Sequence, residues 1–316
     1  MTTVTAPTPT VYVELVPSKP WYVRLRRVAR QKPLGAIGAL VLGAFVLAAL
    51  FGTDFNVAGS NIVPGFSPYP PEQTNILERL EAPSWNHPFG TDAIGRDILS
   101  RVLAGARTAM IIGLAATGLA VMAGTVIGMV SAYAAGTVDL VIQRVMDAFM
   151  SLPPLILLLV LVTVLSPSML TVILVLIFFN MPSSSRLIRG STLVIKEQQY
   201  VEAARAIGAT PIRVMARHIL PQLLAPILVL GSVLIGGTIV TEAALSFLGL
   251  GANSPENPTW GFMLFEAVAR PPLDRFYWMS LAPGIAITLT VLSFNLLGDA
   301  LRDIFDPRLR GTGSGA

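Results

Sequence analysis

Side chains able to do covalent chemistry or to hold a metal are scarce in these 316 residues. The chain has no cysteine and only two histidines, His87 and His218. A chain without cysteine cannot form disulfides, thiolate nucleophiles, iron–sulfur clusters or cysteine zinc sites, and two histidines leave little for a metal site. A phosphate-binding P-loop ends in Gly-Lys-Ser/Thr, whereas Lys19, Lys32 and Lys196 follow Ser, Gln and Ile. We therefore expect no catalytic residue, no metal ligand and no cofactor in this chain.

The most informative polar pattern is residues 196–221, KEQQYVEAARAIGATPIRVMARHILP. An apolar stripe with the spacing of a helix predicts a first short helix: Tyr200, Ala204 and Ile207. Gly208 suits the helix stop, because glycine accepts a positive φ. Thr210 and Pro211 suit the N-cap and first position of a second helix. That helix would place Ile212, Met215 and Ile219 on one face and Arg213 and Arg217 on another.

Two uses of this basic, amphipathic segment remain open on physical grounds. It could be a solvated loop that anchors to anionic lipid, as basic amphipathic segments often do. It could equally be a rigid helix pair that inserts into the groove of a partner protein.

A second group of polar residues lies in the segment 52–106. Ile98, Val102 and Leu103 would lie opposite three charged residues, Arg96, Asp97 and Arg101, which predicts an amphipathic helix at the membrane interface. This helix could simply support the next span, or it could present a docking surface formed by Asp92, Arg96, Asp97 and Trp260. The charged residues fit ion pairs or helix caps as well as contacts, and Trp85, Trp260 and Trp278 suit interfacial anchoring.

The elements that position these residues are membrane helices. Apolar residues make up 53% of the chain and charged residues 13%, with a mean hydropathy of +0.68, whereas soluble chains are about 25% charged. Disordered chains are poor in apolar residues, so disorder is also excluded. Uncharged runs occupy 34–51, 108–138, 148–185, 219–241 and 276–298. Because Ser166-Pro167-Ser168 divides the longest run, we expect an all-α polytopic membrane protein with six transmembrane helices.

The distribution of Lys and Arg predicts the orientation of these spans. Sixteen of the 22 basic residues lie in the N-terminal segment, the loops after spans two and four, and the C-terminal tail. Both termini should therefore face the cytoplasm, and the first span should be an uncleaved signal anchor. The expected divisions are 1–33 (cytoplasmic segment), 34–51 (first transmembrane helix), 52–106 (extracytoplasmic loop with the interfacial helix), 107–302 (core with five helices) and 303–316 (cytoplasmic tail).

Glycine spacing in the second span indicates close helix packing. Gly124 and Gly128 form a small-xxx-small pattern, which lets two backbones approach closely. The contact could lie within this subunit, or the face could line a moving interface.

The segment 196–221 also carries a family resemblance. Glu202-Ala203-Ala204, Gly208 and Leu220-Pro221 resemble the EAA signature of binding-protein-dependent ABC transporter permeases. His218 replaces the isoleucine of the general pattern, but Arg217-His218-Ile219-Leu220-Pro221 is similar to the dipeptide and oligopeptide branch, which usually continues with Asn where this chain has Gln222. FGTDAIGRD at 89–97, EAALSFLGLG at 242–251 and FNLLGDALRD at 294–303 resemble the C-type permeases of that branch, so the resemblance covers roughly residues 85–310 in order.

The resemblance implies a type I ABC importer permease fold, in the cytoplasmic membrane of a prokaryote. It implies four kinds of partner: a B-type sister permease, two cytoplasmic ABC ATPase subunits or domains that hold ATP and Mg, an extracytoplasmic solute-binding protein, and the lipid bilayer. The cytoplasmic coupling loop would be about residues 191–221. In it Glu202, Ala203, Ala204 and Gly208 would contact an ATPase groove, Arg213 and Arg217 would pair with acidic groups there or stay solvated, and His218, Leu220 and Pro221 would complete the signature.

Other functions remain as alternatives. An ion-coupled secondary carrier usually has inverted repeats and charges embedded in broken helices, and no convincing repeat is present. An intramembrane hydrolase needs a base beside its nucleophile, yet neither histidine lies in a predicted span. Within the resembling branch, the cargo could be a di- or oligopeptide, nickel or glutathione, because selectivity is expected to lie largely in the binding protein.

Overall fold

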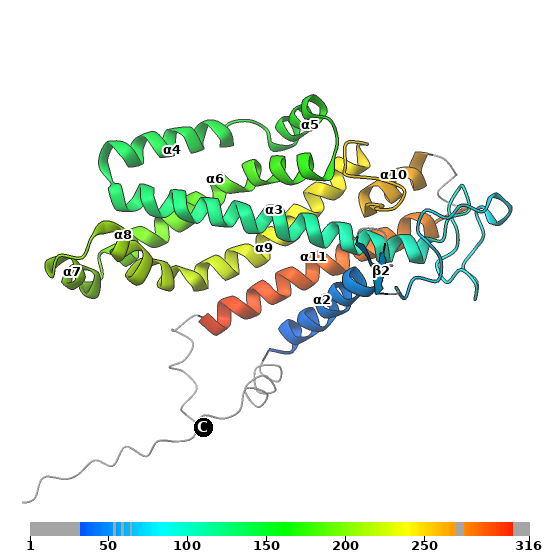
Figure 1. Ribbon diagram of the computed structural model, residues 1–316, viewed down its shortest axis with the longest axis horizontal. Coiled ribbons are helices and arrows are strands. Elements are labelled where there is room, and N and C mark those ends of the chain that lie inside the picture. The colour runs from blue at the N-terminus through cyan, green and yellow to red at the C-terminus, as the bar shows by residue number, and fades with distance from the viewer. Residues whose placement is uncertain (1–31, 53–54, 58–59, 64, 270–274, 306–316) are drawn as a thin grey trace, which may run out of the picture.

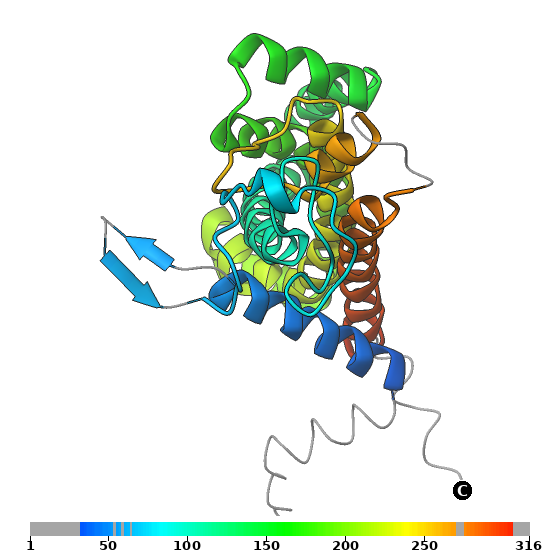
Figure 2. The same ribbon diagram turned by 90° about the vertical axis from the view of Figure 1, so that its right-hand side faces the viewer.

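The computed structural model describes residues 32–52, 55–57, 60–63, 65–269 and 275–305. Nearly all of the predicted N-terminal segment and most of the C-terminal tail lie outside these ranges. Five long helices dominate (Figure 1): α2 (Pro33–Phe51), α3 (Ile98–Ala134), α6 (Met169–Lys196), α9 (Leu220–Phe247) and α11 (Trp278–Phe305). Each is long and apolar enough to cross a membrane, so the predicted all-α polytopic fold is confirmed. The described strands are β1 (Phe55–Val57) and β2 (Ser60–Val63), a small antiparallel hairpin that projects away from the helices (Figure 2).

The third predicted span, 148–165, corresponds to a bent pair of helices. It consists of α4 (Gly136–Met150) and α5 (Pro154–Leu165), which are bent by 84° at the break between them. The sequence predicted that this span starts at residue 148, but α4 begins twelve residues earlier. The start was missed because α4 is amphipathic, and its Asp139 and Asp147 interrupt the apolar run. The predicted division at 166–168 is confirmed, since α5 ends at Leu165 and Ser168 caps α6 through the backbone N–H of Thr171.

The predicted interfacial helix does not exist as a separate element. Residues 98–106 are the first turns of α3, and Asp97 caps that helix by accepting from the backbone N–H of Ser100. Ile98 and Arg101 are 1% and 3% exposed. Helix α3 thus crosses the expected division at 106/107, and the charged side chains that suggested a surface helix are paired inside the protein. Residues 65–97, all of which the structure describes, are mostly irregular and include one short 3₁₀ turn, η1 (Ile76–Glu78).

A layer of hydrogen-bonded polar side chains joins three helices inside the bundle. Thr117 of α3 and Thr238 of α9 lie 2.9 Å apart at their hydroxyl oxygens, and the side-chain amide of Asn180 in α6 donates to Thr238 at 3.1 Å. All three are buried. Such bonds satisfy polar groups that hydrocarbon would leave unpaired, and they hold α3, α6 and α9 in one register.

Helices α3 and α6 also touch at their backbones. A Cβ added at Gly124 would lie 2.6 Å from the Cβ of Ser184, and one at Gly128 would lie 3.0 Å from the backbone nitrogen of Arg189. The glycine spacing thus serves packing within this subunit, which was the first of the two alternatives left open by the sequence.

Gly128→Val is expected to destabilise the protein. The added side chain would force α3 and α6 apart, at a cost of about 1–3 kcal/mol for overpacking. Thermal unfolding of the detergent-solubilised protein measures the loss. Gly118→Val is the matched control, because Gly118 lies in the same helix and an added Cβ there meets nothing within 4 Å. Equal melting of the two variants would contradict the packing argument.

Candidate functional site

Residues 197–219, here called the α7–α8 segment, form one end of the molecule (Figure 1). They comprise α7 (Gln199–Ala206), α8 (Pro211–Val214) and η2 (Met215–Ile219), a π-helical turn that leads into α9. Gly208 has a φ of +84° between the two helices, as a helix stop requires. Pro211 occupies the first turn of α8, and Thr210 stands at its N-cap without a capping hydrogen bond from its side chain. The sequence therefore predicted the two helices and the hinge between them.

An apolar cluster attaches this segment to the bundle. Its members come from the segment, from the start of α9 and from α3 and α6: Val201, Val214, Ile219, Leu223, Met129 (α3) and Ile188 (α6). The first four are fully buried. The guanidinium of Arg205 lies 5.1 Å above the ring centre of Tyr133 in α3. Just before the segment, the Lys196 ammonium at the end of α6 donates to the carbonyl of Ala132 in α3 at 3.0 Å. These contacts tie the segment to α3 and α6, so its position follows theirs.

The predicted apolar stripes are only partly correct. Ala204 and Ile219 point inward, but Ile207 and Ile212 are 86% and 76% exposed, and Tyr200 is 43% exposed. The π-helical turn has more residues per turn than an α-helix, so the period of 3.6 misplaced the buried face of the second helix. The α7–α8 segment therefore exposes two large apolar side chains, Ile207 and Ile212.

The nine residues expected to couple to the ATPase divide into an exposed group and a group that is buried or half-buried. Six are exposed: Glu202, Ala203, Gly208, Arg213, Arg217 and Pro221. His218 and Leu220 are half-buried, and Ala204 is 6% exposed. Ala204 exposes too little surface for the broad partner contact that was expected of it together with Glu202 and Ala203.

Ion pairs brace the same end of the bundle. The Arg189 guanidinium of α6 holds Asp139 of α4 through two nitrogens, one of them at 2.6 Å, and Arg186 of α6 pairs with Asp147 of α4. Sequence analysis did not identify these pairs, since nothing in one sequence shows which charges meet across 39 and 50 residues. They join α4 to α6 beside the α7–α8 segment.

Four buried charges lie at the opposite end of the molecule, here called the α10 end. Arg96 and Arg101 each bond two carboxylates, those of Asp92 and of Glu266 in α10 (Trp260–Ala269), with nitrogen–oxygen distances of 2.6 to 2.8 Å. The four side chains are between 3% and 10% exposed. We call these residues, Asp92, Arg96, Arg101 and Glu266, the charge quartet. Burial alone would lower the pKa of Arg96, but the two carboxylates outweigh that effect and raise the pKa.

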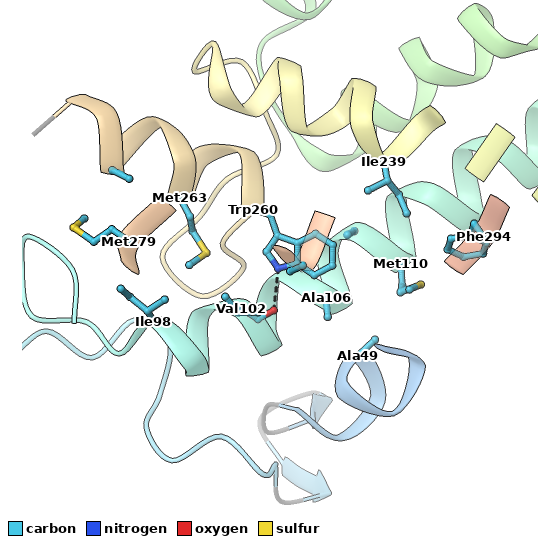
Figure 3. Packing of buried hydrophobic residues seen from close by; sticks show 13 residues of the cluster. Ala49, Ile98, Val102, Ala106, Met110, Ile239, Trp260, Met263, Met279 and Phe294 are labelled. Carbon is cyan, nitrogen blue, oxygen red and sulfur yellow. Dashed lines mark hydrogen bonds between the residues drawn. The ribbon is translucent and has the colours of Figure 1, made fainter. Parts of the chain in front are cut away.

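Other contacts near the charge quartet hold the residues before α3 and the first turns of α3 in place. Asp97, besides capping α3, lies 2.9 Å from Nδ1 of His87, whose ring stacks on Tyr69 at 4.9 Å. The indole nitrogen of Trp260 donates to the carbonyl of Val102 at 3.0 Å, within a cluster of buried residues from α2, α3, α9, α10 and α11 (Figure 3).

These contacts change the interpretation of the predicted docking residues. Asp92, Arg96, Asp97 and Trp260 are 3%, 9%, 3% and 1% exposed, so the ion-pair and cap interpretation fits them and a direct surface contact does not. The partner that the sequence did not reveal is Glu266, 165 residues beyond Arg101.

The fold and its two ends define a polytopic α-helical membrane protein with a braced loop at one end and a braced, largely irregular segment at the other. The sequence profile described as "Binding-protein-dependent transport system inner membrane component" matches residues 124–311. The chain belongs to this family and is an ABC importer permease.

Named relatives agree with this assignment. The chain is 39% identical to a glutathione transport system permease protein, GsiD, from Pectobacterium atrosepticum, over 92% of both chains. It is 38% identical to a GsiD protein from Escherichia coli O6:K15:H31, again over 92% of both. It is 35% identical to a dipeptide transport system permease protein, DppC, from Alkalihalophilus pseudofirmus, over 92% of this chain and 91% of that protein.

Proposed function

We propose that this chain is the C-type permease subunit of an ATP-driven importer for di- or oligopeptides. It would pair with a B-type sister permease and pass solute from an extracytoplasmic binding protein to the cytoplasm by alternating access. The similarity to a dipeptide permease supports this cargo. Glutathione, itself a short peptide, is the second candidate, supported by the similarity to the GsiD proteins. Uptake of labelled dipeptide against labelled glutathione by the reconstituted transporter, with its own binding protein, tests the choice.

The observation that carries the proposal is the α7–α8 segment, which is exposed on its outside and fixed to the bundle on its inside. A partner protein would bind the exposed side chains of the segment, which include Glu202, Ala203, Ile207 and Ile212. Movement of that partner would then move α3 and α6, because the buried cluster joins the segment to both helices. This is the helix-in-groove mode of recognition. The α7–α8 segment would face the cytoplasm, together with both termini.

ATP and Mg would be bound by separate ATPase subunits. No lysine of this chain completes a P-loop, and a P-loop needs that lysine to reach the phosphates. The permease would therefore receive work from ATP hydrolysis without catalysing it. This division of labour and the assignment to the importer family argue against the ion-coupled carrier.

The charge quartet would serve the binding protein indirectly. By fixing residues 87–101 against α10, it would hold the outer segment in one shape, and the exposed side chains of that segment would meet the binding protein. The quartet and Trp260 themselves would not touch it.

A single cysteine at Ala203 is expected to crosslink to an ATPase subunit in the assembled transporter. The chain has no other cysteine, and Ala203 is exposed, so the new thiol is the only site on this chain. Ala82→Cys is the matched control, because Ala82 is exposed at the α10 end. An active transporter in which Ala203→Cys gives no crosslink, or no more than Ala82→Cys, would refute docking at the α7–α8 segment.

A further inference from the structure

A small hollow opens on the α7–α8 segment between the end of α7 and the turn η2. Its volume is about 270 Å³, which suits one or two side chains rather than a cargo molecule. Ala204, Ile207, Gly208 and Ala209 form one wall. Arg213, Arg217 and His218 form the other.

The hollow is positively charged and holds no compensating acid. None of its lining residues is Asp or Glu. Within the described residues, neither Arg213 nor Arg217 has an ion pair or a side-chain hydrogen bond. Other basic side chains at this end do have partners: Arg186, Arg189, Lys196 and Arg205. The two guanidinium groups of the hollow therefore remain available.

His218 adds a third polar group that has no partner. Its Nδ1 atom is shielded from solvent and has no hydrogen-bond partner in the described part of the chain. A buried nitrogen without a partner costs free energy. Because Nδ1 is closed off from solvent, a group in the hollow would reach it only after the His218 ring moved.

The rim of the hollow indicates the kind of molecule that supplies this group. Ile207 is 86% exposed and belongs to the lining itself, and Ile212 next to Arg213 is 76% exposed. Apolar side chains beside a charged centre are typical of the core of a protein interface, where surrounding contacts exclude water. An anionic lipid surface would also match basic and apolar side chains side by side, so lipid binding is one of the outcomes that the test below separates.

We propose that this hollow receives a carboxylate side chain of the ATPase subunit, bound by Arg213 and Arg217. Guanidinium groups match the two oxygens of a carboxylate, and such charge-assisted bonds are among the strongest in proteins. The proposal rests on the proposed function, since it assumes that an ATPase docks here, and it adds the chemistry of the contact. Because the hollow lies between α7 and η2, the bound carboxylate would hold α7 and the η2 turn in a fixed arrangement.

The test compares charge variants in the assembled transporter. In Arg213→Gln/Arg217→Gln, retention of the ATPase subunits on the purified permease pair should weaken by about tenfold or more, as for loss of a desolvated interfacial charge pair. The dependence of retention on salt should also become shallower. Arg144→Gln is the control, because Arg144 is a 75% exposed cation of α4, in a separate ion pair at 3.7 Å, and it should retain the ATPase like the parent. Arg213→Lys/Arg217→Lys should recover part of the retention, since charge remains but the fork is lost.

The outcomes separate the two proposals. If the Ala203→Cys crosslink forms but the double Gln variant retains ATPase with unchanged strength and salt dependence, the carboxylate proposal is overturned while docking stands. If the crosslink is absent in the parent background, docking itself fails, and the carboxylate proposal fails with it. A double Gln variant that loses binding to phosphatidylglycerol vesicles, with ATPase retention intact, would assign the hollow to lipid and also overturn the proposal.

Discussion

Replacing Glu266 by alanine is expected to be among the most destabilising single changes at the α10 end. The substitution leaves Arg96 and Arg101 buried with Asp92 as their one remaining carboxylate. Removing one partner of a buried ion pair costs about 3–5 kcal/mol, because the charge that remains is uncompensated. In the described residues Nε of Arg101 already lacks a partner, so this guanidinium has little alternative bonding. Thermal unfolding of the detergent-solubilised permease measures the loss.

Two further variants identify the cause. Glu266→Gln keeps an oxygen acceptor of similar shape but removes the charge, so its stability should lie between those of the parent and the alanine variant. Glu256→Ala removes an exposed carboxylate from the loop before α10 and should melt like the parent. If Glu266→Ala and Glu256→Ala have the same melting temperature, the quartet contributes nothing to stability. The proposed support of the outer segment would then lose its basis.

The long helices were predictable because hydrocarbon imposes one requirement on length and polarity. A span needs about 20 apolar residues, and α2, α9 and α11 each began within two residues of their predicted starts. The starts of α3 and α4 were missed for the same reason: both helices begin in stretches that contain charged residues. Arg107 of α3 donates to the carbonyl of Ala49, and Asp139 of α4 is held by Arg189. Pairing makes these charges compatible with a packed helix, but the pairs join distant parts of the chain.

The candidate site shows the same division between local and distant information. Gly208 and Pro211 follow local backbone rules, so the hinge was predicted with its correct residues. The inward direction of Val201 and Val214 depends on the cluster beneath them, and the π-helical turn shifted the second helix out of the assumed period. The charge quartet depends on α10 folding back onto the start of α3, which no local pattern specifies. Sequence therefore located both ends of interest. At the α10 end it left two roles open, and the ion-pair and cap role fits the structure whereas the surface contact does not.

Replacing Gly208 by valine is expected to uncouple ATP hydrolysis from uptake. Gly208 has a φ of +84°, and a β-branched residue is strongly disfavoured in that region, with a cost of about 1–2 kcal/mol for a non-glycine residue. An added Cβ meets nothing within 4 Å, so the effect comes from the backbone and not from a clash. The hinge should relax away from this conformation and shift α7 relative to α8. Uptake by the reconstituted transporter should then fall several-fold while ATP hydrolysis continues, which paired assays of both activities measure.

Two glycine variants distinguish the hinge from a general effect of substitution. Gly208→Asn should retain most of the coupling, because asparagine tolerates the left-handed region better than other residues. Gly43→Val makes the same chemical change in α2, where an added Cβ also meets nothing and φ is not positive, so uptake should persist. The hinge conformation explains coupling only if valine at 208 fails where asparagine at 208 and valine at 43 succeed. Normal uptake by Gly208→Val would mean that the two short helices transmit force without a fixed angle between them. Transmission would then depend on the contacts of each short helix with α3 and α6, such as those of Val201 and Val214 in the buried cluster.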